Sequence, residues 1–203
     1  MLARGIRSTR LRNFDKTLIL QIDVMEKFRK MAYKYMNCVQ VGRMLMQASD
    51  KLNIPFIMVE QNKRVMGETA KEILELKHPK VKSFEKFIMS AYEVPEIKKA
   101  IDDVKPDNVL IYGLEAHACV LQTTLDLLEA GYNVHALVDG ISSFKKVDRA
   151  AAIVRMMNSG AIVSTVEAAL LDMMYDSKKP EFKVMLGIVK NKLNIEDPLT
   201  DLL

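Results

Sequence analysis

The chain has 203 residues, of which 49% are hydrophobic, and its formal net charge at pH 7 is +4. This length favours a single domain of about 180 residues with short tails, and the composition provides enough apolar residues for a buried core. Four arginines precede the first acidic residue, Asp15, so the rest of the sequence is balanced in charge, which argues against a nucleic-acid binder. No stretch approaches the roughly 20 apolar residues that a membrane span needs.

Short apolar runs alternate along the chain with longer segments whose apolar residues recur at helical spacing. Residues 81–92 follow neither pattern clearly. In chain order, the pattern predicts a strand over 17–23, a helix over 25–52, a strand over 54–59, helices over 68–76 and 93–104, a strand over 108–113, a helix that ends at Gly131, a strand over 133–139, a helix over 147–158, a strand over 161–165, and helices over 166–175 and 181–190.

Strands that alternate with helices indicate a parallel sheet covered on both faces. We therefore expect a three-layer, Rossmann-like α/β fold with a mostly parallel six-stranded sheet. The predicted organisation is a basic N-terminal tail over residues 1–14, one domain over 15–176, and a C-terminal helix and tail over 177–203.

Polar residues and a glycine stand where the predicted strands end. In open α/β sheets, ligands bind beyond the carboxyl ends of the strands, so we expect these residues to gather at one edge. They are Asp23, Glu60, Gly113 and Asp139. A strand-end aspartate such as Asp23 can also simply cap the helix that follows it.

Cys119 is predicted to lie in the first turn of the helix that follows strand 108–113. Unpaired N–H groups and the positive end of the helix dipole stabilise a thiolate there, and the same N–H groups can bind the oxyanion of an acyl-transfer intermediate. The alternative is a buried cysteine that only fills space, which is the commoner role of a lone cysteine.

Several motifs carry a family resemblance. The run "LIYGLEAHACVLQTTLDLLEAGYNVHALVDGISS" resembles the nucleophile segment of the isochorismatase-like cysteine hydrolases, a superfamily that includes nicotinamidases and N-carbamoylsarcosine amidohydrolases. "LILQIDVMEKF" resembles the family's first strand with its catalytic aspartate, and "FEKFIMSAY" resembles its lysine segment. With "GAIVSTVEAALLDMM", the similarity covers roughly residues 15–175 and is greatest to the isochorismatase-domain-containing proteins.

The resemblance implies a catalytic triad of Asp23, Lys86 and Cys119. Asp23 would accept the thiol proton, Lys86 would stabilise the anionic state, and the thiolate would attack a carbonyl carbon. The backbone N–H groups of Glu115 and Cys119 would form an oxyanion hole, with a cis peptide at Leu114–Glu115. The implied reaction is hydrolysis of a small amide or related C–N bond through a thioester.

The lysine segment is short, so its register has to be chosen. Lys86 is favoured over Lys82 because Ser90 follows it by four residues, as in the family's pattern. Without the resemblance, Lys86 would be interpreted as a solvated surface lysine.

Four further residues are candidates for substrate binding, namely Phe28, Gln61, Tyr92 and His117. Phe28 and Tyr92 could equally be core packing, and His117 could equally be an exposed loop histidine.

The sequence also departs from parts of the family. Nicotinamidases carry a metal-binding Asp-x-His pair after the second strand, whereas this chain reads EQNKR there. None of the three histidines has ligand spacing, so we expect no bound metal or cofactor. Isochorismatases lack the catalytic cysteine, so Cys119 argues against their vinyl-ether reaction. The alternative function is a catalytically silent scaffold that acts through oligomeric assembly.

The expected partners are a small-molecule substrate and further copies of the chain, in a dimer, tetramer or larger ring, with no nucleic acid and no membrane. Two distant cysteines, Cys38 and Cys119, fit a reducing compartment and predict a cytoplasmic protein. The Arg-rich first 13 residues resemble an organellar presequence, so a mitochondrial or other organellar location is the alternative.

Overall fold

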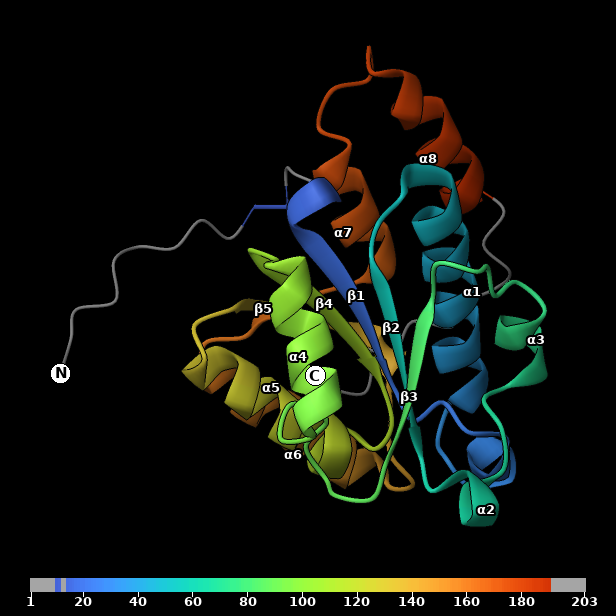
Figure 1. Ribbon diagram of the computed structural model, residues 1–203, viewed down its shortest axis with the longest axis vertical. Helices are drawn as coiled ribbons and strands as arrows, with labels where there is room; N and C mark the ends of the chain where they lie inside the picture. The colour runs from blue at the N-terminus through green and yellow to red at the C-terminus, as the bar shows by residue number, and fades with distance from the viewer. Residues whose placement is uncertain (1–9, 12–13, 191–203) are drawn as a thin grey trace, which may run out of the picture.

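The structure is a computed structural model and describes residues 10–11 and 14–190 (Figure 1). Most of the basic tail predicted over residues 1–14 lies outside the described residues, as does the part of the predicted C-terminal tail after residue 190. None of the helices in the described part of the chain combines the length and the hydropathy that a membrane span requires.

Six strands form one sheet, and every pair of neighbours in it is parallel. The strand order is β3-β2-β1-β4-β5-β6, which confirms the predicted α/β architecture. The strands are β1 (Thr17–Ile22), β2 (Phe56–Gln61), β3 (Lys82–Lys86), β4 (Asn108–Gly113), β5 (Asn133–Ile141) and β6 (Ile162–Ser164).

Helices cover both faces of this sheet. In Figure 1, α4, α5 and α6 lie on one face, and α1, α3, α7 and α8 lie on the other. The α-helices are α1 (Tyr35–Leu52), α2 (Lys63–Met66), α3 (Lys71–Leu74), α4 (Pro95–Val104), α5 (Leu121–Glu129), α6 (Lys146–Asn158), α7 (Val166–Met173) and α8 (Pro180–Lys190). Shorter 3₁₀ turns span η1 (Phe14–Lys16) and η2 (Glu26–Lys30), and a π-helix, η3, spans Ala116–Val120.

The central strands β1 and β4 are buried along their whole length because helices cover both of their faces. The buried side chain of Gln21 in β1 is satisfied internally, since Tyr112 Oη donates a 2.6 Å hydrogen bond to Gln21 Oε1. A buried hydroxyl–amide pair of this kind avoids the cost of an unpaired polar group in the core.

The predicted helix over residues 25–52 is wrong in its first third. After the short η2 turn, the backbone N–H of Tyr33 donates to Ser143 O, and Lys34 adopts a left-handed conformation with φ of 48°. These two features divert the chain, and α1 therefore begins only at Tyr35.

The predicted helix over residues 68–76 also shrinks to α3. Its first residues run alongside residues 24–26 instead, with an antiparallel bridge between Met25 and Thr69 and a 2.9 Å bond from Ala70 N to Val24 O. Tertiary pairing has overridden the local helical pattern here.

Residues 82–86, for which no element was predicted, form the edge strand β3. Its residues are mostly exposed, so the strand lacks the apolar run by which the inner strands were identified. Only its last residue, Lys86, is buried, and this places Lys86 at the carboxyl end of the sheet.

Candidate active site

The carboxyl ends of β1, β2 and β3 bring together a buried ion pair. Asp23 follows β1 directly, in a left-handed conformation with φ of 49°, and its N–H donates to Val59 O. Lys86 Nζ lies 2.7 Å from Asp23 Oδ2, and the two side chains are 0% and 1% exposed, respectively. Lys86 also donates to Gln61 Oε1 at 2.5 Å and to the carbonyl oxygen of Ile88 at 3.1 Å. One ion pair and two hydrogen bonds therefore hold the ammonium group in one position.

The third member of this cluster is the thiol of Cys119, which comes from the segment after β4. Cys119 lies in the π-helix η3, just before α5, and is 8% exposed. Its thiol lies near enough to the Asp23 carboxylate and the Lys86 ammonium group for both charges to act on its pKa, and its Sγ is 3.8 Å from Met89 Sδ. The three residues proposed from the family resemblance are thus within mutual reach.

Burial dominates the protonation of these groups. It raises the pKa of Cys119 to about 11, with a further contribution from the Asp23 carboxylate that Lys86 only partly opposes. Burial also raises the pKa of Asp23, against the lowering effect of Lys86. At neutral pH the thiol is therefore protonated, whereas a helix N-terminus acting alone would favour the thiolate.

The segment before Cys119 presents backbone donors. The Leu114–Glu115 peptide is cis, as the family resemblance implies. Among the described residues, the backbone N–H of Glu115 has no hydrogen-bond partner, so it remains available to an oxygen atom. The Glu115 carboxylate itself accepts a 3.1 Å bond from the N–H of Phe144.

A cavity of about 400 Å³ opens beside Cys119. Its polar lining residues are Asp23, Lys27, Gln61 and Glu115, and Ala118 lies next to the thiol. The two phenylalanines in its wall meet edge to face, with ring centroids 5.6 Å apart. The rest of the wall is apolar, and its larger side chains are those of Phe28, Met31, Met66, Met89, Leu114 and Phe144.

Two of the four predicted substrate-binding residues line the cavity beside Cys119, and the other two do not. Phe28 and Gln61 line the cavity beside Cys119, whereas His117 lines an adjoining cavity of about 340 Å³ together with Glu93 and Asp126, with Met89 and Ala118 lining both. His117 Nδ1 lies 3.0 Å from Ser143 Oγ. Tyr92 lines neither cavity.

Tyr92 instead packs against residues of α4 and against Tyr132. Its hydroxyl donates to Asp102 at 3.0 Å and accepts from Lys98 at 2.7 Å, and its ring packs edge to face on Tyr132. These contacts fit the alternative that Tyr92 is a core-packing residue and not a substrate-binding one.

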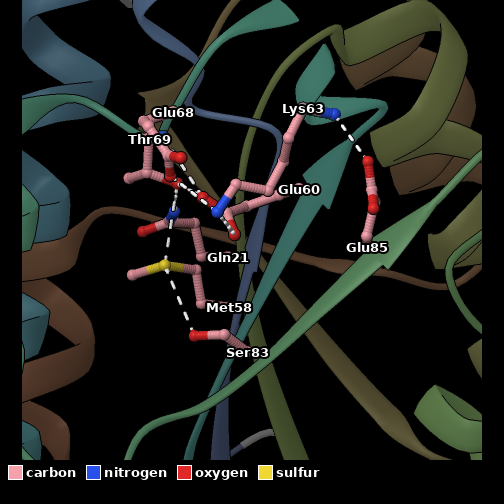
Figure 2. Close-up of polar contacts among 8 residues, drawn as sticks. All are labelled: Gln21, Met58, Glu60, Lys63, Glu68, Thr69, Ser83 and Glu85. Carbon is pink, nitrogen blue, oxygen red and sulfur yellow. Dashed lines mark hydrogen bonds and ion pairs between the residues drawn. The ribbon is translucent and has the colours of Figure 1, made fainter.

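Glu60, at the end of β2, is a second buried carboxylate beside Asp23. Figure 2 shows its carboxylate contacted by Thr69 and by Lys63. Thr69 donates to Glu60 Oε1 through its hydroxyl at 2.9 Å and its N–H at 3.2 Å, and Lys63 Nζ lies 3.4 Å from Oε2. The negative charge of Glu60 contributes to the raised pKa of Asp23. The sequence placed Glu60 at this edge but assigned it no role, because the contacts of Thr69 and Lys63 depend on the path of the 62–70 segment.

The remaining strand-end residues have structural uses. Both oxygens of Asp139 accept from the N–H of Val166, at 3.0 and 3.1 Å, at the start of α7. Gly113 has φ of 128°, and a Cβ there would lie 1.8 Å from the carbonyl oxygen of Ile22. Within residues 10–11 and 14–190, no three His, Cys, Asp or Glu side chains are grouped as they would be around a metal ion.

The isochorismatase domain model matches residues 17–168, which include the whole of this site. The chain belongs to the isochorismatase domain family.

Relatives in this family span most of the chain. Isochorismatase domain-containing protein 2 of Xenopus laevis is 37% identical over 175 residues, which are 85% of this chain and 83% of that protein. The secreted isochorismatase effector Isc1 of Phytophthora sojae is 33% identical and covers 89% of this chain and 88% of its own length. The predicted resemblance to the isochorismatase-domain-containing proteins is confirmed.

Solved structures agree with this assignment. The MAR1 ribonuclease of Caenorhabditis elegans has a TM-score of 0.84 and 33% identity, and covers 90% of this chain and 94% of its own. Escherichia coli YcaC, described as an octameric hydrolase of unknown specificity, shares the fold with a TM-score of 0.81 at 18% identity, covering 93% of each chain. The isochorismatase family fold and these relatives place the chain in a hydrolase family.

Proposed function

We propose that this isochorismatase-family protein is a cysteine hydrolase that cleaves a small amide or related C–N bond. The observation that carries the proposal is that Asp23 and Cys119 line one cavity while Lys86, buried behind its wall, is paired with Asp23. A carboxylate, an ammonium group and a thiol placed close together are the groups that acyl transfer through a thioester requires. The cavity beside them provides room for the acyl group.

The reaction begins with a proton transfer within this cluster. As Cys119 Sγ attacks the amide carbonyl carbon, the Asp23 carboxylate accepts the thiol proton. The raised pKa of Asp23 makes its ionised form a stronger base for this step. Lys86 offsets the negative charge that would otherwise build up between the carboxylate and the sulfur.

The carbonyl oxygen becomes an oxyanion and is bound by the backbone N–H groups of Glu115 and Cys119. The tetrahedral intermediate then collapses, the C–N bond breaks, and protonated Asp23 gives its proton to the departing amine. Water attacks the resulting thioester with Asp23 again as the base, and the products are a carboxylic acid and free Cys119.

A second candidate is cleavage of RNA, since the relative from Caenorhabditis elegans is described as a ribonuclease. The apolar wall of the cavity and the balanced charge outside the N-terminal arginines do not favour a phosphate backbone. A silent scaffold is the third. Assembly into a homo-oligomer is compatible with either of the first two, and light scattering of the purified protein measures the subunit number.

The test is a parallel assay of amines released from small amides and of fragments released from single-stranded RNA. We expect amine release by the wild type, with at least about a thousandfold loss in Cys119→Ala and Asp23→Asn. RNA cleavage that survives Cys119→Ala would replace this proposal with a ribonuclease. No turnover of either substrate class would favour the scaffold.

A further inference from the structure

The lining of the cavity beside Cys119 restricts the chemistry of what it can hold. Six of its larger side chains are aromatic, thioether or aliphatic, and Phe28 and Phe144 form an edge-to-face pair within the wall. Such a wall favours ligands by removing apolar surface from water. Thioether side chains are unbranched and adaptable, so Met31, Met66 and Met89 can fit around chains or rings of different shape.

The charged groups around the cavity are balanced and already have partners. Asp23 is paired with Lys86, Lys27 Nζ donates to the carbonyl oxygen of Val65 at 3.1 Å, and Glu115 accepts from Phe144 N at 3.1 Å. Two carboxylates and two ammonium groups give the site no net charge. A charged acyl group would therefore lose its hydration in a cavity that has no excess of opposite charge.

Besides the N–H of Glu115, the cavity wall contains a second neutral group without a hydrogen-bond partner among the described residues. Gln61 Oε1 is occupied by Lys86 at 2.5 Å, so the amide nitrogen of Gln61 is what remains. Within the described chain this nitrogen has no hydrogen-bond partner. It can donate to an acceptor such as an amide oxygen, but it carries no charge that would compensate that of a carboxylate, and it cannot accept from an ammonium group.

We infer that the substrate is an amide whose acyl group is uncharged and apolar, of the size of a short aliphatic chain or a single aromatic ring. The inference rests on the proposed function only in calling the ligand a substrate. The preference for uncharged, apolar ligands follows from the lining of the cavity. A volume of about 400 Å³ is at the lower end for small-molecule sites, which sets the size of the acyl group.

Binding and turnover are measured separately, so that the two proposals can fail separately. Calorimetry with Cys119→Ala measures the affinity for propanamide, pentanamide, hexanamide and benzamide, and for the charged amides of succinic acid and β-alanine. We expect affinity to rise about fourfold per methylene until the cavity is full. The charged amides should bind at least about tenfold more weakly than neutral amides of equal length.

A variant that adds one charge provides the matched test. Met31 lines the cavity and is 45% exposed, so Met31→Lys should fold. In the Cys119→Ala background, this substitution should raise the affinity for the succinic acid amide relative to that for hexanamide by at least about tenfold. Met157→Lys is the control, because Met157 is 51% exposed on α6 and does not line the cavity.

Equal or tighter binding of a charged amide by the parent, or affinity that does not depend on chain length, would overturn the inference. If neutral apolar amides bind to Cys119→Ala in the expected order but the wild type never hydrolyses them, the ligand class stands and the proposed hydrolase fails.

Discussion

Lys86 Nζ and Asp23 Oδ2 lie 2.7 Å apart, and both side chains are withdrawn from water. Burial is costly for each charge taken alone, and the pair is retained because the partners compensate each other. Lys86 ends the edge strand β3 and Asp23 directly follows the inner strand β1, so the sheet fixes the separation of the two backbones.

Removal of one partner should therefore destabilise the fold. We expect Lys86→Met to lower the free energy of unfolding by about 3–5 kcal/mol, because an uncompensated carboxylate is left buried. Urea denaturation measures this change. The control is Lys99→Met, which breaks an exposed pair of the same 2.7 Å length with Asp103 and should cost under about 1 kcal/mol. Equal effects at the two sites would contradict the account of the buried pair.

The raised pKa of Cys119 predicts how the free protein reacts with iodoacetamide. The thiolate is the reactive form, so alkylation at pH 7 should be slow and should accelerate with pH toward about 11. In Asp23→Asn the nearby negative charge is gone, so the pKa falls and alkylation at pH 8 should become faster. Peptide mass mapping follows Cys119, with Cys38 as an internal control.

Cys38 is fully buried in α1, and burial raises its pKa to about 12. It should remain unmodified until the protein unfolds. Rapid alkylation of Cys119 at pH 7 would contradict the protonated thiol described above.

The charge of Glu60 predicts a shift in the pH dependence of turnover. Its negative charge favours protonated Asp23, so Glu60→Gln should lower the pKa of Asp23 and move the acid limb of kcat/KM to lower pH. Gln can keep an acceptor oxygen for Thr69, so folding should be preserved. The control is Glu85→Gln, since Glu85 is exposed on β3 and its carboxylate binds Lys63 N. An unmoved acid limb would limit Glu60 to a structural role.

The close packing around Gly113 predicts that one added methyl group strongly lowers the stability of the fold. In Gly113→Ala the new Cβ would meet the backbone oxygen of Ile22, which cannot move within the sheet, so we expect a loss above about 3 kcal/mol. Gly67 also has a positive φ, of 77°, but faces open space. Gly67→Ala should cost only about 1–2 kcal/mol, and thermal unfolding of both variants tests the contrast.

The fold was largely predictable because inner parallel strands are buried on both faces and appear as continuous apolar runs, as β1 and β4 do. The edge strand β3 was not, since solvated residues give no such run. For the same reason the burial of Lys86 could not be predicted, since a lysine is by itself expected in solvent. Lys86 became a candidate only through the family resemblance.

The division between Phe28 and Gln61 on one side and Tyr92 and His117 on the other could not be predicted either. Sequence distance from Cys119 says little about cavity walls, because the η3 turn directs neighbouring side chains to different sides. His117, two residues from Cys119, faces the second cavity, whereas Phe28 comes from a distant 3₁₀ turn.

The central claim is that Cys119 forms a covalent bond to the acyl group of a neutral amide. Intact-mass analysis after rapid acid quench, with hexanamide as substrate, tests it most directly. We predict a wild-type species heavier by one hexanoyl group, mapped to Cys119 and absent from Cys119→Ala. Turnover of the amide with an unmodified Cys119, or an adduct that persists in Cys119→Ala, would contradict the account.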